Sequence, residues 1–578
     1  MQAADRAPSI IIPDRTGKSP TGKPPAGFAP SSAGLAILRA VLCCTLACVF
    51  SGGLHAQVPP GALTPGAVQD TIPPPKAPAP TAPAQLVFPV APPQIEHDRN
   101  AQRFTINSFR FTGNTVYPER TLKRAVERYL DQQLNLYDLT RAADIVTRLY
   151  RDDGYLVARA VIPAQKVEKG IVHIEVIEGR IGKLIFEGNK RYSEAALLRR
   201  MPGLAAGALI TTAAMERDML LLNDLPGLTA RATLEPGAVF GTTDVRIRVE
   251  EKTLSGYIQP NNFGRDEIGR WRTDGGLNVN NLLGFGDQLS IQGIASQSNL
   301  LHYGYVAYSV PLTNQGTRLA FAYSATNYSL SNDLAVLDIE GDVRNREVSL
   351  THPFLRSRSQ TLAANVGYRN TRLRQTALGT QISDNSIGLY NAGLRYSQIG
   401  TDASISTLSA QLYSNFRTNT SGTRQDAERL KYELDATHLR GLNPNWDFFA
   451  RALISQSSET LPDSEKFALG GPGNIRGYRS SELRGDKGWL ATVELRRQIT
   501  LFNTLGIIGF FYDAGIVKFQ APGFIDGSAT LMSAGANVTF FPLRNVPIKL
   551  EFAVPVSNTV AGDGRTNGRV WISAGASF

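Results

Sequence analysis

The sequence predicts a membrane all-β protein, a 16-stranded β-barrel preceded by two small α+β domains. Three observations support this prediction. The N-terminal part contains a repeat that combines strands and helices, whereas helical periodicity disappears beyond Thr253. The C-terminal part alternates polar and apolar residues in segments of about ten residues, the length of a tilted transmembrane strand. The 53 Gly, 25 Phe, 19 Tyr and 4 Trp among 578 residues suit a protein of many strands and turns.

Residues 1–56 are predicted to be a signal peptide. Residues 34–54 are mostly apolar, and the small residue Ala56 offers a cleavage point before Gln57. An uncleaved membrane anchor is the alternative, but Arg39 interrupts the apolar run. All three cysteines of the chain lie in this segment, so the mature protein is expected to have no disulfide, no thiolate nucleophile and no cysteine metal site.

Residues 57–102 are predicted to be a Pro-rich periplasmic linker that can include a plug segment. Residues 57–100 hold 12 of the 33 prolines, which favours an extended, semi-rigid chain. The stretch "QLVFPVA" at 85–91 is a candidate for a short docking segment, and the residues alone leave that question open.

Residues 103–252 contain a duplicated module. The stretches "FTGNTVYPERTL", from Phe111, and "FEGNKRYSEAAL", from Phe186, share the pattern F-x-G-N-x-x-Y-x-E-x-x-L. An alternating strand precedes each copy, and two helical segments and two strands follow it, so the modules span 103–179 and 180–252. Their β-α-α-β-β order and Gly-Asn turn resemble POTRA domains, the periplasmic polypeptide-binding modules of outer-membrane assembly proteins. Two generic α+β modules without a binding role are the alternative.

Residues 253–578 are predicted to form the transmembrane β-barrel. Its sixteen candidate strands fall near 254–262, 271–281, 288–297, 303–311, 317–327, 345–352, 361–372, 384–396, 404–416, 428–438, 445–457, 488–498, 505–514, 531–541, 546–555 and 569–578.

Connection lengths and strand polarity favour a membrane barrel over a soluble β-sandwich. Connections after even-numbered strands are short and several after odd-numbered strands are long, as in outer-membrane barrels. The twelfth strand places Thr492, Glu494 and Arg496 on one face, which a wet lumen accepts and a dry core does not. The long connections are 328–344, 417–427, 458–487, 515–530 and 556–568.

The last strand is amphipathic and ends in Phe578. Such a strand resembles the signal that the outer-membrane barrel assembly machinery reads. We therefore expect that machinery to insert the barrel into the outer membrane of a Gram-negative bacterium, with outer-membrane lipid around it.

Enzymatic motifs are not found in the sequence. There is no H-E-x-x-H, G-x-S-x-G, P-loop or G-x-G-x-x-G pattern, and no histidine pair has the spacing of metal ligands. The formal net charge of +10 is modest for this length and is no nucleic-acid signature. We therefore expect no enzyme activity, no cofactor, no metal and no nucleic-acid partner.

Several motifs resemble the TpsB family of two-partner-secretion outer-membrane transporters. The segment 260–293 is similar to the family's first barrel hairpins. "GGPGNIRGY" at 470–478 resembles its loop-six signature, usually written V-R-G-Y, with Ile475 in place of Val. "FYDAG" at 511–515 resembles its later F-x-D-x-G signature. Together with the linker and the repeated modules, the likeness covers essentially the whole chain.

This resemblance implies a function and a partner. An unfolded exoprotein, a TpsA-type adhesin, haemolysin or toxin, would be captured through its N-terminal secretion domain by the POTRA modules. It would then cross the barrel lumen to the cell surface without ATP. The alternatives are a β-barrel assembly factor of the same superfamily, which usually has three or more POTRA repeats, and a general porin.

The resemblance also implies the site. In this family the loop-six arginine pairs with the aspartate of the later signature, which here are Arg476 and Asp513. The transport motif is therefore expected to be Ile475, Arg476, Gly477 and Tyr478 in the loop at 458–487, and its partner motif to be Phe511, Asp513 and Gly515 on the barrel wall. The resemblance leaves two roles for the pair: it acts as a switch, or it only holds the barrel in shape.

Overall fold

The computed structural model describes residues 64–73, 86–87, 102–420, 423–426, 429–519, 527–557 and 567–578. The predicted signal peptide lies outside these residues, as does most of the predicted linker. Among the helices of the described residues, none is long and apolar enough to cross a membrane.

The first repeat folds as a three-stranded sheet covered by helices. Its elements are β3 (Ser108–Thr112), α3 (Glu119–Val126), α4 (Leu136–Asp152), β5 (Arg159–Val161) and β6 (Ile171–Ile177), with the short strands β2 (Phe104–Thr105) and β4 (Gln133–Leu134) beside them. The sheet order is β3-β6-β5, in which β3 runs parallel and β5 antiparallel to β6. The β-α-α-β-β order matches the sequence prediction.

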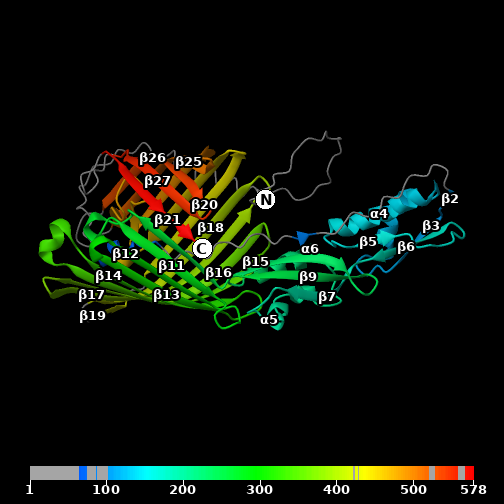
Figure 1. The fold of residues 1–578 in the computed structure, drawn as a ribbon, viewed down its shortest axis with the longest axis horizontal. Helices are drawn as coiled ribbons and strands as arrows, with labels where there is room; N and C mark the ends of the chain where they lie inside the picture. The colour runs from blue at the N-terminus through cyan, green and yellow to red at the C-terminus, as the bar shows by residue number, and fades with distance from the viewer. Residues whose placement is uncertain are drawn as a thin grey trace, which may run out of the picture. The chain divides into compact units, whose positions relative to one another are not determined.

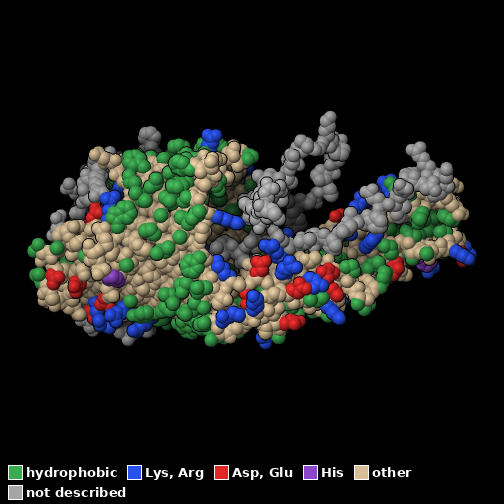
Figure 2. All heavy atoms as spheres, viewed as in Figure 1, with side chains coloured by type: hydrophobic (Ala, Val, Ile, Leu, Met, Phe, Trp, Pro, Cys, Tyr) green, Lys and Arg blue, Asp and Glu red, His purple; other side chains and the backbone are tan. Residues whose placement is uncertain are grey.

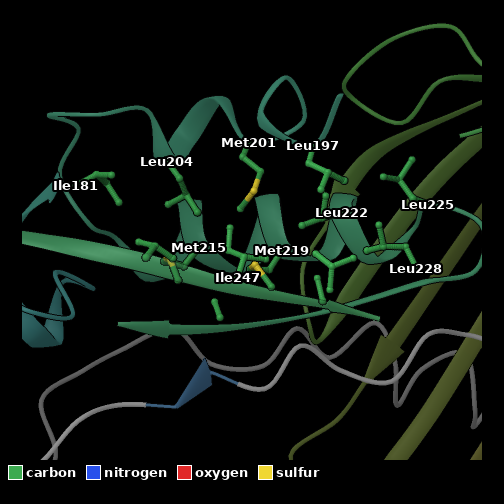
Figure 3. Close-up of a cluster of buried hydrophobic side chains, with 14 of the residues drawn as sticks. Ile181, Leu197, Met201, Leu204, Met215, Met219, Leu222, Leu225, Leu228 and Ile247 are labelled. Carbon is green, nitrogen blue, oxygen red and sulfur yellow. The ribbon is translucent and has the colours of Figure 1, made fainter. Parts of the chain in front are cut away.

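The second repeat has the same plan. Its elements are β7 (Arg180–Glu187), α5 (Glu194–Leu198), α6 (Thr212–Asn223), β8 (Leu228–Pro236) and β9 (Thr242–Glu251). Here too the first strand is parallel and the second antiparallel to the last, β9. Helix α6 buries Met215, Met219 and Leu222 against the sheet (Figure 3). Among the residues that the structure describes, one strand is added that has no counterpart in the first repeat: β1 (Leu86–Val87) lies along β8, giving the order β1-β8-β9-β7.

In each repeat a glutamate binds the backbone of the Gly-Asn turn, which gives both turns the same role. Glu178 accepts a hydrogen bond of 2.8 Å from the backbone N–H of Val116, directly after the first turn. Glu251 accepts one of 2.8 Å from the N–H of Lys190 in the second turn. The last strand of each module thereby satisfies the N–H groups that the turn leaves unpaired.

Residues 254–577 form a closed antiparallel barrel of sixteen strands (Figure 1). The first strand, β10 (Leu254–Asn261), pairs with the last two segments, β28 (Arg569–Ala574) and β29 (Ala576–Ser577), which occupy one position. The others are β11 (Arg272–Asn280), β12 (Gln288–Ser296), β13 (Leu301–Pro311), β14 (Arg318–Ser329), β15 (Glu340–Arg356), β16 (Gln360–Ala377), β17 (Thr380–Ile399), β18 (Ser404–Thr420), β19 (Thr423–Asp426) with β20 (Leu430–Asn443), β21 (Trp446–Ser457), β24 (Lys487–Leu501), β25 (Thr504–Phe519), β26 (Gly527–Leu543) and β27 (Val546–Pro555).

Three long connections were predicted wrongly, because strands extend into them. Strand β15 begins at Glu340, inside the connection predicted at 328–344. Strand β18 runs to Thr420, inside 417–427, and β25 runs to Phe519, inside 515–530. The length of ten residues marks only the part of a strand that crosses a membrane, whereas these hairpins continue beyond it.

The outer surface of the barrel is a band of apolar side chains (Figure 2). Their neighbours along each strand point inward and are mostly polar, as the predicted alternation requires. Such a band suits lipid. Its exposed members include Ile258, Val306, Phe321, Val366, Tyr390, Leu412, Val493, Phe510, Phe552 and Val570.

A short helix, α2 (Pro65–Gln69), lies against the inner wall of the barrel. Thr64 caps its N-terminus, and Val68 is fully buried beside Ile294, Leu301 and Tyr328. Arg272, on β11, donates a hydrogen bond of 2.7 Å to the carbonyl of Thr71, just after the helix. This described segment of the predicted linker lies in the lumen, and we call it the plug helix.

Candidate functional site: loop six and the plug helix in the barrel lumen

Loop six, residues 458–487, is a folded hairpin. It contains a short 3-10 turn, η7 (Asp463–Glu465), and the paired strands β22 (Phe467–Leu469) and β23 (Leu483–Gly485). The sequence analysis predicted a loop at 458–487 without strands, and the structure adds this strand pair to it. Two glycines make the hairpin turn, since Gly470 and Gly471 have φ values of 106° and 110°, which L side chains rarely adopt.

The hairpin packs on the barrel wall through a small apolar cluster. Ile475 and Tyr478, at its tip, are fully buried among side chains of the loop and of the barrel wall. The Tyr478 hydroxyl also lies 2.7 Å from Oγ of Ser557. The other buried members of this cluster are Phe467, Leu469, Leu483, Leu490, Val517 and Leu531.

Arg476 lies in a pocket of the barrel wall lined by three carboxylates. Its Nε and Nη2 donate to the two carboxylate oxygens of Asp513 at 2.9 and 2.8 Å, and its backbone N–H donates to Asp513 at 3.2 Å. Its Nη1 is 3.0 Å from Glu494 and 3.5 Å from Glu551. The guanidinium stacks on the ring of Phe511, 3.2 Å from the centroid. Bidentate, stacked geometry is specific to arginine and fixes the orientation of the loop.

The carboxylate of Asp513 is held in place from both sides. Thr492, on β24, and Ser533, on β26, each donate a hydroxyl hydrogen bond to it at 3.1 Å. Asp513 itself is fully buried. A buried carboxylate that loses the guanidinium keeps only neutral donors, which are these two hydroxyls and the backbone N–H of residue 476, so the pair is strongly favoured once formed.

Two glycines allow the loop to approach the wall closely. A Cβ on Gly477 would lie 2.8 Å from Cβ of Ser533, and one on Gly515 would lie 2.9 Å from Cδ2 of Leu469. Each of the three fixed residues of the F-x-D-x-G motif therefore makes a different contact with loop six. Phe511 stacks with Arg476, Asp513 binds it, and Gly515 leaves room for Leu469.

A second ionic cluster ties loop six to the connection between β10 and β11. Arg479 donates to Glu267 and to Glu482, both at 2.9 Å. Arg265, almost fully buried, donates to Glu267 and to the carbonyl of Ser481, both at 3.3 Å. Burial tends to raise the pKa of Glu267, but Arg265 and Arg479 outweigh it and lower that pKa below its usual value.

A third contact connects Glu465 of loop six to strands β16 and β20 of the barrel wall. Arg369, on β16, donates to both oxygens of Glu465 at 2.7 and 2.8 Å, and Lys431, on β20, donates to the carbonyl of Glu465 at 2.9 Å. The sequence did not reveal this contact or the Arg479 cluster. The alternation of polar and apolar residues places charged residues on lumen-facing positions, but it does not identify the residues that they contact.

Arg484 joins loop six to the plug helix. Its Nε donates to Asp70 at 2.7 Å, and its Nη1 donates to the hydroxyl of Thr64 at 3.2 Å and contacts Asp463. Asp463 also accepts from the N–H of Gly66 at 2.7 Å. Burial raises the pKa of Asp70 to about 6, although Arg484 opposes the shift.

Phe578 lies at the seam of the barrel, away from loop six. Its backbone N–H and C=O exchange hydrogen bonds with Gly256 of β10 at 3.0 and 3.1 Å. Its side chain is 61% exposed.

Two family models match the chain. A model described as haemolysin secretion/activation protein ShlB/FhaC/HecB matches residues 241–540. A model described as POTRA domain, ShlB-type, matches residues 104–179, which is the first repeat.

Curated relatives of this chain are outer-membrane transporters. The heme/hemopexin transporter protein HuxB of Haemophilus influenzae is 25% identical over 507 residues, covering 85% of this chain and 87% of that protein. The outer membrane transporter CdiB of Dickeya dadantii is 24% identical, covering 70% of this chain and 75% of that protein. The hemolysin transporter protein ShlB of Serratia marcescens is 23% identical, covering 65% of this chain and 69% of that protein.

Solved structures share the fold. CdiB from Escherichia coli superposes with a TM-score of 0.65 at 19% identity, covering 96% of this chain and 100% of that chain. BamA from Haemophilus ducreyi, lacking POTRA domains 1–3, superposes with a TM-score of 0.51 at 16% identity, covering 82% of this chain and 100% of that chain.

Proposed function

The chain belongs to the haemolysin secretion/activation family ShlB/FhaC/HecB, and from that membership we propose how it captures an unfolded exoprotein and exports it. Proteins of this family are outer-membrane transporters of two-partner secretion, with POTRA domains in the periplasm. This protein is such a transporter. The family transports secreted exoproteins, among them haemolysins and heme-binding proteins.

Capture takes place at the two repeats. The first matches the POTRA model, and the second has the same strand order and the same carboxylate-bound turn, which supports a second POTRA domain at 180–252. Small sheets with an accessible edge can bind an extended chain through backbone hydrogen bonds, whatever its sequence. The partner is a TpsA-type adhesin, haemolysin or toxin, recognised through its N-terminal secretion domain.

Export proceeds through the barrel lumen, where loop six and the plug helix lie. Beside loop six, a cavity of about 420 Å³ is lined mainly by polar and charged side chains, among them Glu347, Arg369, Asn391, Glu433 and Arg451. Polar walls can exchange hydrogen bonds with an extended backbone as it passes. Folding of the exoprotein outside the cell favours export, so the protein needs no nucleotide, cofactor or enzymatic step.

Arg476 serves as a structural tie that keeps loop six on the wall during export. The observation that supports this role is its pocket, in which three carboxylates and the Phe511 ring surround one guanidinium. The contacts of Arg484 are different, because they join loop six to a five-residue helix from another part of the chain. The plug helix can therefore leave the lumen while Arg476 stays bound.

The C-terminal strand carries the insertion signal. Phe578 ends the seam strand with its side chain outward, where the barrel assembly machinery can reach it during insertion into outer-membrane lipid. The likeness to BamA is one of fold alone, and family membership favours a transporter over a barrel assembly factor.

Deleting the gene and comparing the secreted and outer-membrane proteins of the two strains tests the function. We expect one large secreted protein to disappear from the cell surface while other outer-membrane barrels keep their abundance. Expression of the full chain restores export, and a chain lacking residues 103–178 inserts into the membrane without restoring it. A general loss of outer-membrane proteins would instead identify a barrel assembly factor.

A further inference from the structure

The second repeat holds a strand that does not belong to its own fold. Strand β1 pairs in parallel with β8, with Leu86 opposite Ala232 and Val87 opposite Thr233. In Figure 3 it is the short blue arrow beside the green strands. Its two residues come from the segment between the plug helix and the first repeat, about 145 positions earlier in the chain than their partners.

The first repeat shows that the module is complete without such a strand. Its β5 corresponds to β8, since each is antiparallel to the last strand of its module. Within the described residues, no strand pairs with the outer edge of β5. The pairing of β1 is therefore an addition to one of two equivalent edges, and the edge of β8 accepts an extended segment from elsewhere.

We propose that the edge of β8 is a docking site for an extended segment of the exported polypeptide, and that β1 occupies this site until that segment displaces it. The proposal rests on the export function proposed above, and it specifies which edge the exoprotein takes. Pairing through the backbone suits an unfolded chain, because every residue except proline carries the same donor and acceptor.

The extent of the pairing makes β1 displaceable. Strand β8 has nine residues, whereas the described pairing with β1 covers two of them, Ala232 and Thr233. A segment that pairs along most of β8 can therefore form more backbone hydrogen bonds with it than the described pairing of β1 does. Because β1 is tethered, it still excludes short or weakly pairing segments through its high effective concentration.

The surroundings of the edge indicate the chemistry of the incoming segment. Along β8, Ala230, Ala232 and Leu234 point into the core, while Arg231 is exposed on the other face. Beyond the end of β8, the turn to β9 carries two apolar residues that are mostly exposed, Val239 at 67% and Phe240 at 77%. A segment of alternating polar and apolar residues, long enough to reach this turn, fits the edge.

A disulfide between β1 and β8 tests whether β1 must leave. Neighbouring strands lie about 4.8 Å apart, within the Cα separation that a disulfide spans. The substitutions Val87→Cys and Thr233→Cys place two cysteines opposite each other, and the three native cysteines all lie before residue 57. Val87→Cys alone is the matched control.

We expect the cross-linked protein to lose export of the surface protein identified by gene deletion, and a reductant to restore it. The single-cysteine control should export normally with or without the reductant. If the cross-linked protein exports as well as the control, β1 is a permanent part of the sheet and the proposal is wrong.

Peptide binding to the purified full-length protein tests the edge independently of export. The probe is a fluorescent peptide of residues 81–92 of this chain, and a scrambled peptide is its control. Replacing Leu86 and Val87 by proline removes the backbone donors of β1. This variant should bind the probe roughly ten- to a hundredfold more tightly than the unmodified protein, because the tethered competitor is gone, and the cross-linked protein should not bind it.

The two experiments separate the possible failures. A harmless cross-link in a protein that exports contradicts the docking proposal and leaves the export function intact. If no exported protein is found, the export function is wrong, and the peptide experiment still decides whether β8 exchanges strands. Equal binding of the probe by all three proteins would overturn the proposal.

Discussion

Two arginines of loop six, Arg476 and Arg484, have similar surroundings but connect the loop to different parts of the molecule. Each binds carboxylates, and each has little solvent exposure. The partners of Arg476 belong to the barrel wall, on β24, β25 and β27, whereas Arg484 binds Asp463 of its own loop and Asp70 of the plug helix. One arginine therefore holds the loop to the wall, and the other holds a separate segment to the loop. We therefore expect the plug helix to leave the lumen more readily than loop six does.

The largest expected effect comes from replacing Arg476. Arg476→Ala leaves the carboxylate of Asp513 buried without its cation, which costs about 3–5 kcal/mol. Loop six should detach from the wall, export should fall to background, and the barrel should stay in the membrane. Secretion, together with trypsin cleavage within residues 467–489 of the purified protein, measures this.

Two variants make the Arg476 test specific. Arg476→Lys keeps the charge but cannot form the bidentate contact, so it should restore little. Arg497→Ala, which removes an arginine stacked on Trp446 of the wall, should export normally. Normal secretion by Arg476→Ala and by Asp513→Ala would show that the pair is dispensable.

Replacing Arg484 should have a smaller and different effect. Arg484→Ala removes charge-assisted hydrogen bonds worth about 1.5–3 kcal/mol each before solvent screening, so the plug helix should leave the lumen more often. Export should persist, and ion conductance in planar bilayers should rise well above that of Arg497→Ala. Loss of export with unchanged conductance would instead show that Arg484, like Arg476, is needed for export and does not hold the plug helix.

A single methyl group on the wall should loosen loop six partially. In Gly515→Ala the new Cβ meets Leu469, which is fully buried, and overpacking of this kind costs about 1–3 kcal/mol. Trypsin cleavage of the loop should become faster than in the unmodified protein and stay slower than in Arg476→Ala. Gly473→Ala is the matched control, since its Cβ would have no heavy atom within 4 Å.

The smallest effect concerns pH and the plug helix. The pKa of Asp70 is about 6 when the helix is docked, raised by burial above its ordinary value of 3.8, while Asp463 and Arg484 act on it in opposite directions. The docked state therefore binds the proton more tightly, and docking strengthens as the pH falls from 7.5 to 5. Because the side chain is still 21% exposed, the effect is modest.

Conductance measures this pH effect directly. It should be lower at pH 5 than at pH 7.5 in the unmodified protein, and the difference should shrink in Asp70→Asn. A conductance that rises on acidification in the unmodified protein, but not in the variant, would reverse the sign assigned to Asp70.

Alternation and repeats predicted most of the fold, because both are local signals. The strands near 254–262 and 546–555 lie within one residue of the observed β10 and β27. The lengths of β15 to β18 were missed, since polar residues outside a membrane mark strands poorly. The pairing of Asp513 with Arg476 was implied by the family resemblance and not by a local signal.

Partners distant in the sequence were beyond local signals. Glu494 was expected to face the lumen, yet the sequence alone did not place it beside Arg476, and Glu551 gave no signal at all. The contacts of Glu267 and Glu465 with arginines depend on how the loop folds back inside the barrel. The plug helix has five residues, too few for a periodic pattern, and was predicted only as a segment that the linker could include.

The indole of Trp571 adds a consequence for the order of assembly. Its Nε1 donates a hydrogen bond of 2.8 Å to the backbone carbonyl of Arg476. Trp571 lies on β28, and β28 is the strand whose pairing with β10 completes the ring. Loop six, although made earlier, obtains its full set of contacts only when the C-terminal strand has arrived. The closing of the cylinder therefore adds one of the contacts that hold loop six in the lumen.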